Sequence, residues 1–212
     1  MAFVDLDDFL ARARLRLDPV QGRERLPEGG DLEYLDPEAI TNIRAAAVLV
    51  PLIPRKGGAT ALLTHRPETM PTHAGQVAFP GGKVDPEDAD EVEAALREAE
   101  EEVGVVPDSV ELVARGAPYI TGTAFRIVPV IGVLPADFVP RPDPTEVADV
   151  FEAPLSFLMS AHNHTRRSGY WNGQTRHYFE MPWEGHRIWG VTAGIIRALY
   201  ERLYEAGEET AA

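Results

Sequence analysis

An amphipathic segment at residues 91–103 constrains the fold more than any other part of this sequence. Its apolar residues recur at helical spacing; they are Val92, Ala95, Leu96, Ala99 and Val103. At about 100° per residue they fall within about a third of a helical circle, which is the width of a buried stripe. Gly104 stands where a C-cap glycine belongs. The pattern predicts a helix with one side packed on a sheet.

Three glutamates lie on a neighbouring arc of the same helix. Glu98, Glu101 and Glu102 are spaced i, i+3 and i+4, so their side chains share one side. Carboxylates this close repel one another, and a bound cation offsets the repulsion. Hard cations such as Mg²⁺ take oxygen ligands and bridge protein carboxylates to substrate phosphates. The alternative is a solvated acidic face, and the helix alone does not decide between the two.

A pair of glycines shortly before the helix favours the cation. Phe79-Pro80-Gly81-Gly82-Lys83 precedes it by a few residues. Paired glycines permit unusual backbone dihedrals and a close approach of the backbone to a ligand. The Gly81 carbonyl is therefore a candidate to lie beside the acidic face.

Length and charge limit the class of protein. A chain of 212 residues favours one domain. The formal net charge of −14 argues against a nucleic-acid partner, whereas metals and local arginines can still attract an anionic small molecule. The chain has no cysteine, which excludes thiolate chemistry and fits a cytoplasmic protein. We expect no signal peptide and no membrane span, because the apolar runs are short.

Helices and strands alternate along the rest of the chain. Periodicity predicts helices at 5–16, 154–159 and 191–205, and loops at 18–40 and 66–82. It predicts a hairpin of strands 43–53 and 59–65, and further strands at 111–119, 126–134, 164–168, 175–180 and 186–189. Strands flanked by helices predict a layered α/β fold. We divide the single domain into an N-terminal helix and loop extension (1–40), a core (41–190) and a C-terminal helix (191–212).

The glycine pair and the acidic helix together resemble the Nudix box, G-x5-E-x7-R-E-U-x-E-E-x-G-U with U aliphatic. Gly82 matches the first glycine, and the run from Arg97 to Val105 matches the second half with Ala99 at the aliphatic position. Asp88 stands where the box has its first glutamate, and the stretch from Asp88 to Arg97 is one residue longer. These departures leave the metal-bearing half intact and affect the loop before the helix.

An upstream motif resembles the coenzyme A pyrophosphatase branch of that family, roughly L-L-T-x-R-[SA]-x3-R-x3-G-x3-F-P-G-G. The stretches 62–66 and 75–82 match it, and further matches at 125–132, 146–151 and 188–193 extend the resemblance from about 43 to 200. Pro67 and Pro71 replace the usual Ser or Ala and the second Arg. The branch commonly carries an Asp and an extra residue in its box, as this chain does.

The resemblance implies a Nudix-type α/β/α sandwich with a central mixed sheet. It also implies a metal-dependent hydrolase that cleaves coenzyme A or acyl-CoA to 3′,5′-ADP and (acyl-)4′-phosphopantetheine. The metal would be Mg²⁺ or Mn²⁺, held by Glu98, Glu101, Glu102 and the Gly81 carbonyl.

Other residues are candidates for catalytic and binding roles. Glu98 is the favoured general base, and Glu146, on a loop after the proline-rich connector 140–144, is the alternative. Arg66, Lys83 and Gly82 are candidate contacts to the substrate, and His73 is a weaker one. An aromatic group could stack on adenine, although core packing or a dimer contact is an alternative for its members, Tyr170, Trp171, Phe179 and Trp183.

Two other functions stay open. A Nudix pyrophosphatase could act on ADP-ribose, another nucleotide sugar or a nucleoside triphosphate, and Pro71 favours this alternative because it removes the second arginine of the motif. A non-catalytic nucleotide-binding module is the other alternative, but such modules tend to lose box carboxylates, and this chain keeps Glu98, Glu101 and Glu102. A homodimer is also left open.

Overall fold

The centre of the molecule is a mixed sheet around two parallel neighbours, β2 (Arg44–Arg55) and β8 (Phe125–Val133). The computed structural model describes residues 4–22, 27, 29–31, 34, 41–69, 74–171 and 173–205. Along the sheet the order is β1-β7-β8-β2-β3-β4, with β5 paired to β2, β6 to β8 and β9 to β3. These strands are β1 (Gly29–Gly30), β3 (Gly58–His65), β4 (Val77–Ala78), β5 (Gly81–Lys83), β6 (Glu111–Arg115), β7 (Tyr119–Ile120) and β9 (Asp149–Pro154).

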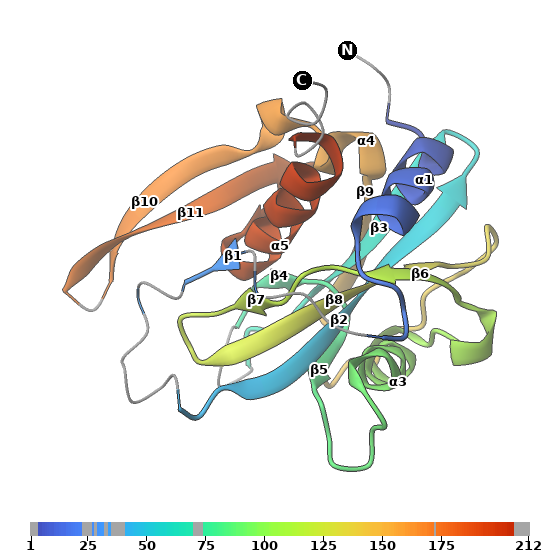
Figure 1. Cartoon of the computed structure of the whole chain (residues 1–212), viewed down its shortest axis with the longest axis horizontal. Coiled ribbons are helices and arrows are strands. Elements are labelled where there is room, and N and C mark those ends of the chain that lie inside the picture. The colour runs from blue at the N-terminus through green and yellow to red at the C-terminus, as the bar shows by residue number, and fades with distance from the viewer. Residues whose placement is uncertain are drawn as a thin grey trace.

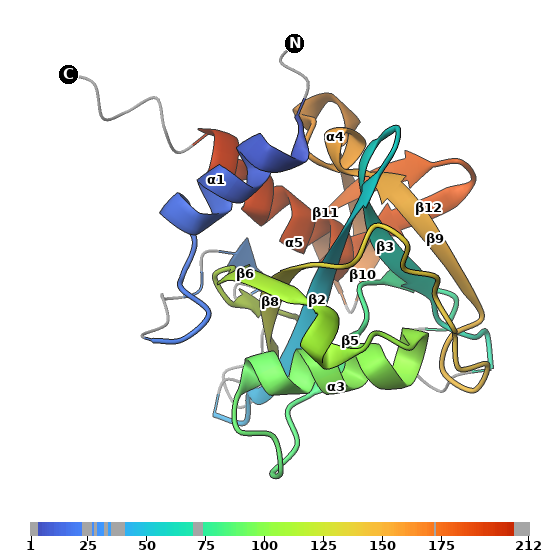
Figure 2. The same ribbon diagram turned by 90° about the vertical axis from the view of Figure 1, so that its right-hand side faces the viewer.

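Helices cover both faces of this sheet (Figure 1, Figure 2). Side chains alternate along β2, so Leu49 and Ile53 join the core under α3 (Glu91–Val103), whereas Val50 and Leu52 join the opposite core. That second core also holds apolar residues of α1 (Leu6–Arg16) and α5 (Gly190–Tyr200). The predicted α/β class and its α/β/α layering are confirmed.

A second, smaller sheet follows β9 and the short helix α4 (Leu155–Leu158). It consists of three antiparallel strands, β10 (Thr165–Trp171), β11 (Gln174–Trp183) and β12 (His186–Trp189). The turns η2 (Pro107–Ser109) and η3 (Ala161–Asn163) and the π-helical end η4 (Glu201–Glu205) complete the described elements. The β10–β11 hairpin extends away from the main sheet (Figure 1).

Several sequence predictions of secondary structure need correction. The expected loops at 18–40 and 66–82 contain the short strands β1, β4 and β5, and β9 was not predicted at all. Segment 111–119 divides into β6 and the start of β7, and the last helix changes to a π-helical turn after Tyr200. The missed strands are held by pairing with distant segments, such as β5 with β2 and β9 with β3, which local periodicity does not report. No helix among the described residues is long and apolar enough to cross a bilayer.

Candidate active site

The acidic helix is fixed at both ends by caps. Asp90 accepts hydrogen bonds from the backbone N–H of Val92 at 2.9 Å and of Glu93 at 3.0 Å. Gly104 ends the helix in the left-handed conformation with φ 71°, and its N–H donates to the Glu100 carbonyl at 2.9 Å. Between the caps, the apolar side of α3 is buried against β2, as the periodicity predicted.

Three carboxylates converge beside this helix, and we call them the carboxylate cluster: Glu98, Glu102 and Glu146. One oxygen from each lies within 4.8 Å of the other two. Glu102 is only 4% exposed, Glu98 is half-buried and Glu146 is exposed. Three carboxylate oxygens at this separation match the ligand preference of Mg²⁺ or Mn²⁺, so the cluster can hold a divalent cation.

Glu146 reaches the cluster because the connector before it is bonded to the end of α3. The backbone N–H of Arg141 donates to the Val103 carbonyl at 2.9 Å, and that of Asp143 donates to the Glu102 carbonyl at 3.0 Å. The Glu146 N–H then donates to the Asp143 carbonyl at 3.1 Å. The sequence assigned Glu146 only a catalytic role, and no local signal placed its side chain with Glu98 and Glu102.

Burial disfavours the ionised form of the clustered carboxylates when no cation is bound. It raises the pKa of Glu102 to about 8, and the nearby charge of Glu98 contributes to this increase. Burial also raises the pKa of Glu98, although its hydrogen bond from Arg97 opposes the change. A divalent cation would remove the repulsion and favour the ionised form of both side chains.

The two glycines of β5 lie directly against these carboxylates. The Gly81 N–H donates to Glu102 Oε2 at 3.4 Å. A Cβ on Gly82 would collide with the carboxylate of Glu98, and one on Gly81 would collide with the backbone of Ala47 and Val48. A side chain therefore does not fit at Gly81, and at Gly82 it would displace the Glu98 carboxylate. The Gly81 amide, rather than its carbonyl, makes the described contact to the cluster, so the carbonyl as a metal ligand stays a prediction.

Arg97 contacts one carboxylate of the cluster and one outside it. Its Nη1 donates to Glu98 at 3.0 Å and to Glu101 at 3.3 Å. The Glu101 side chain is 56% exposed and lies outside the group of three converging oxygens. The structure thus brings Glu98 and Glu102 together as predicted, whereas the Glu101 carboxylate pairs with Arg97. The role of Glu101 as a metal ligand stays a prediction.

Arg66 is placed to act on the cluster from β3's end. Its positive charge lowers the pKa of Glu102, in opposition to the effect of burial. The Arg66 Nε is buried, and no acceptor for it is found among the residues that the structure describes. Lys83 is exposed, and its carbonyl accepts from Arg97 Nη2 at 3.1 Å. His73 and Pro71 lie outside the described residues.

The aromatic group divides into two pairs. Tyr170 and Trp171 are 77% and 66% exposed near the tip of the β10–β11 hairpin. Phe179 and Trp183 are half-buried against the core, and Trp183 lies 4.7 Å from Phe157 between ring centroids. Core packing therefore accounts for Phe179 and Trp183, and adenine stacking stays a prediction for the exposed pair.

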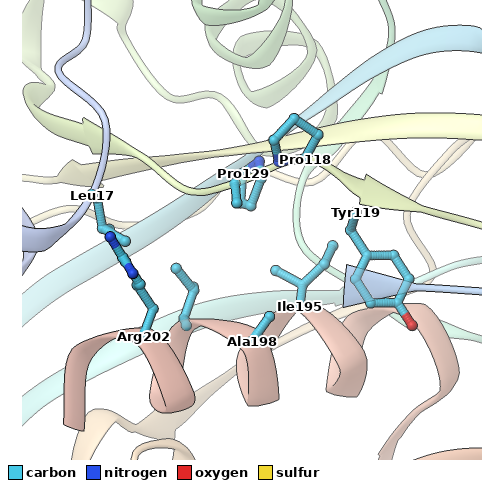
Figure 3. A pocket seen from close by; sticks show the side chains of 9 residues that line it. Leu17, Pro118, Tyr119, Pro129, Ile195, Ala198 and Arg202 are labelled. Atoms are coloured by element: carbon cyan, nitrogen blue, oxygen red, sulfur yellow. The ribbon is translucent and has the colours of Figure 1, made fainter. Parts of the chain in front are cut away.

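The structure also contains a pocket that is separate from the carboxylate cluster and lies beside the C-terminal helical segment. Ile195, Ala198 and Arg202 project from the C-terminal helical segment toward Pro118 and Pro129 (Figure 3). Its lining is mainly apolar, and none of the predicted site residues that the structure describes contributes to it. It is not a candidate for phosphate chemistry.

Comparison with known proteins places these features in a family. The family model of the NUDIX domain matches residues 43–171. The chain is 40% identical over 194 residues to the "Uncharacterized Nudix hydrolase NudL" of Escherichia coli strain K12, with 92% of each chain covered. The protein of the same name from Citrobacter koseri is 39% identical with the same coverage. The crystal structure of RenU, a Nudix hydrolase from M. smegmatis, aligns at 26% identity and a TM-score of 0.46, covering 52% of this chain and 70% of RenU.

Proposed function

Because the chain belongs to the Nudix family and is a Nudix pyrophosphohydrolase, we propose that its substrate is coenzyme A or acyl-CoA. The products would be 3′,5′-ADP and (acyl-)4′-phosphopantetheine. One observation supports this proposal: the upstream motif that resembles the coenzyme A branch lies against the carboxylate cluster. Its Gly81 N–H donates to Glu102 Oε2 at 3.4 Å, and the charge of its Arg66 lowers the pKa of Glu102. The motif that suggests the substrate is therefore next to the carboxylates that suggest the chemistry.

The cluster supplies the ligands for one or more divalent ions, Mg²⁺ or Mn²⁺. Such an ion would neutralise charge on the pyrophosphate and lower the pKa of water. Glu98 and Glu102 are the principal ligands, with Glu146 as the third converging carboxylate. Glu101 would join them by turning away from Arg97, and the Gly81 carbonyl is a further candidate.

Hydrolysis requires a base near the attacking water. We assign Glu98 this role because it is half-buried beside Gly82 and Glu102. The water oxygen forms a bond to phosphorus, its proton passes to the base, and the bridging P–O bond breaks. Glu146 is the alternative base, and its exposure leaves it accessible to water. The variants Glu98→Gln and Glu146→Gln distinguish the two candidates. At saturating metal, kcat should fall in the variant that has lost the general base.

Phosphate contacts would come from three residues. Arg66 offers a guanidinium whose buried Nε has no acceptor among the described residues, which suits a phosphate oxygen. Lys83 is an exposed cation next to the glycine pair, and Gly82 lets a phosphate approach the backbone. The acidic, cysteine-free composition is consistent with a cytoplasmic enzyme that takes a small molecule rather than a nucleic acid.

A second candidate substrate class is favoured by Pro71, which stands where the branch motif has its second arginine. ADP-ribose, other nucleotide sugars or nucleoside triphosphates would then be hydrolysed at the same cluster. A panel of these compounds, coenzyme A and acetyl-CoA, assayed with Mg²⁺ and with Mn²⁺, decides between them. The coenzyme A proposal expects the highest kcat/KM for coenzyme A or its thioester, and it fails if ADP-ribose is turned over equally well.

A further inference from the structure

We propose that His65, Asp149 and His186 form a binding site for a divalent transition metal such as Zn²⁺, apart from the carboxylate cluster. One ligand atom from each residue lies within 4.8 Å of the other two. His65 Nε2 and His186 Nδ1 are 2.8 Å apart. Both histidines are half-buried and Asp149 is exposed. None of the three has a part in the proposed hydrolysis, so this site goes beyond it.

The backbone holds the three residues together from three strands. His65 ends β3 and lies opposite Asp149 of β9 in the antiparallel register. The Ala148 N–H donates to the His65 carbonyl at 2.8 Å, which extends the pairing beyond the strand. His186 begins β12 of the second sheet, and β3, β9 and β12 are seen together on one side of Figure 2. A metal here would therefore link the two sheets.

Phe151 fixes the orientation of the His186 ring. The two rings are stacked with centroids 3.7 Å apart and an interplanar angle of 5°. The His65 ring lies 5.5 Å from Phe151, tilted by 44°. Phe151 is two residues after Asp149 on β9, so their side chains share a face of the strand. The histidine rings thus lie on a packed surface beside a carboxylate, which limits the reorganisation needed to bind a metal.

Two imidazoles and one carboxylate suit Zn²⁺ and similar transition-metal ions better than Mg²⁺, which prefers oxygen ligands alone. Nitrogens bound at about 2.0–2.1 Å to a tetrahedral ion lie about 3.3 Å apart. The His65 and His186 nitrogens therefore need to move apart by only about half an ångström, which a small ring rotation provides. The competing interpretation is a direct imidazole hydrogen bond, in which one ring donates its proton to the other and no metal is needed.

The site lies on the opposite face of the main sheet from the carboxylate cluster. Side chains alternate along β3: Leu62 packs in the core under α3, whereas Leu63 packs in the core that contains Ile188 of β12. His65 is two residues after Leu63 and shares its face. The cluster belongs to the α3 side, so the two sites can be loaded and mutated separately.

The first test removes the competing oxygen ligands. A Glu98→Gln/Glu102→Gln double variant should still bind one equivalent of Zn²⁺ in equilibrium dialysis, and Co²⁺ in its place should give visible absorption bands typical of nitrogen ligands in a four-coordinate site. Zn²⁺ should also raise the Tm of this variant, because binding to the folded state alone stabilises it. No bound Zn²⁺ in the double variant would overturn the proposal.

The second test removes the new ligands one at a time in the double-variant background. His186→Gln and Asp149→Asn should each weaken Zn²⁺ binding by at least about tenfold and reduce the Tm gain. His162→Gln is the matched control, because His162 is an exposed histidine on η3 outside the group. Circular dichroism checks that each variant folds. If His186→Gln does not fold, the result for Asp149→Asn alone tests the site. Unchanged Zn²⁺ affinity in the folded ligand variants would contradict the assignment.

Discussion

Arg97 donates from Nε and Nη2 to the two carboxylate oxygens of Asp88, each at 2.9 Å. This bidentate pair holds the pKa of Asp88 below its usual range. Asp88 also accepts from the Asp85 N–H at 2.8 Å, so it ties the loop before α3 to the helix. The position at which this sequence departs from the Nudix box therefore supports the arginine that contacts Glu98.

Loss of this pair should disturb the site without removing a metal ligand. We expect Asp88→Asn to lower the free energy of unfolding by about 1 kcal/mol, or roughly 2–4 °C in Tm for a chain of this size. Metal affinity should also fall, because Arg97 is then less firmly held against Glu98. Thermal melts and Mn²⁺ titrations measure the two effects. Glu87→Gln, at an exposed position in the same loop, is the control; equal effects from both changes would refute the role of Asp88.

A side chain at position 82 should lower turnover as strongly as the loss of a catalytic residue. In Gly82→Ala the new Cβ meets the Glu98 carboxylate, so Glu98 must move and turnover should fall by about 100-fold or more. Gly57→Ala is the matched control, since a Cβ at Gly57 meets no atom within 4 Å. Steady-state kinetics of the two variants checks the prediction. Full activity of Gly82→Ala would show that the position of Glu98 is not critical.

Glu102 should be indispensable for turnover and dispensable for folding. Glu102→Gln keeps the shape of the side chain but removes its charge, and we expect at least about a 1,000-fold loss of kcat/KM with the far-UV circular dichroism spectrum unchanged. The control is Glu100→Gln on the exposed side of the same helix. Full metal-dependent activity of Glu102→Gln would remove Glu102 from the metal site.

The same glutamate should give the metal-free protein a characteristic pH dependence. Its pKa is about 8 when folded and near the ordinary 4.5 when unfolded. The folded state therefore keeps a proton that the unfolded state releases, so the free energy of unfolding decreases as pH rises through the interval between these values. The Tm of EDTA-treated protein should fall between about pH 5 and about pH 8 more steeply than that of Glu102→Gln. Parallel slopes would contradict the raised pKa.

Local sequence patterns predicted the parts of the site that one helix determines. The stripe of α3, its Gly104 cap and the adjacency of Glu98 and Glu102 all follow from helical periodicity and were confirmed. Periodicity did not report β5, because Gly81 and Gly82 have weak strand propensity and their pairing partner is the distant β2.

Residues placed by long-range contacts were harder to predict. Glu146 joins the cluster through a connector that hydrogen-bonds to the end of α3, and Asp149 meets His65 only because β9 pairs with β3. Helical spacing also grouped Glu101 with Glu98 and Glu102, and it places Glu101 four residues after Arg97, with which it pairs at 3.3 Å. It did not indicate that Arg97 would also bind Asp88 and Glu98. The division of the chain at residues 40 and 190 stays a prediction.

Product analysis is the most direct test of the central claim that the carboxylate cluster cleaves the pyrophosphate of coenzyme A. Wild-type protein and Glu102→Gln would each be incubated with coenzyme A and Mg²⁺, and the products identified by mass spectrometry. We expect equal amounts of 3′,5′-ADP and 4′-phosphopantetheine from the wild type and almost none from the variant. Intact coenzyme A under conditions in which the wild type hydrolyses ADP-ribose, or equal product from Glu102→Gln, would contradict the account.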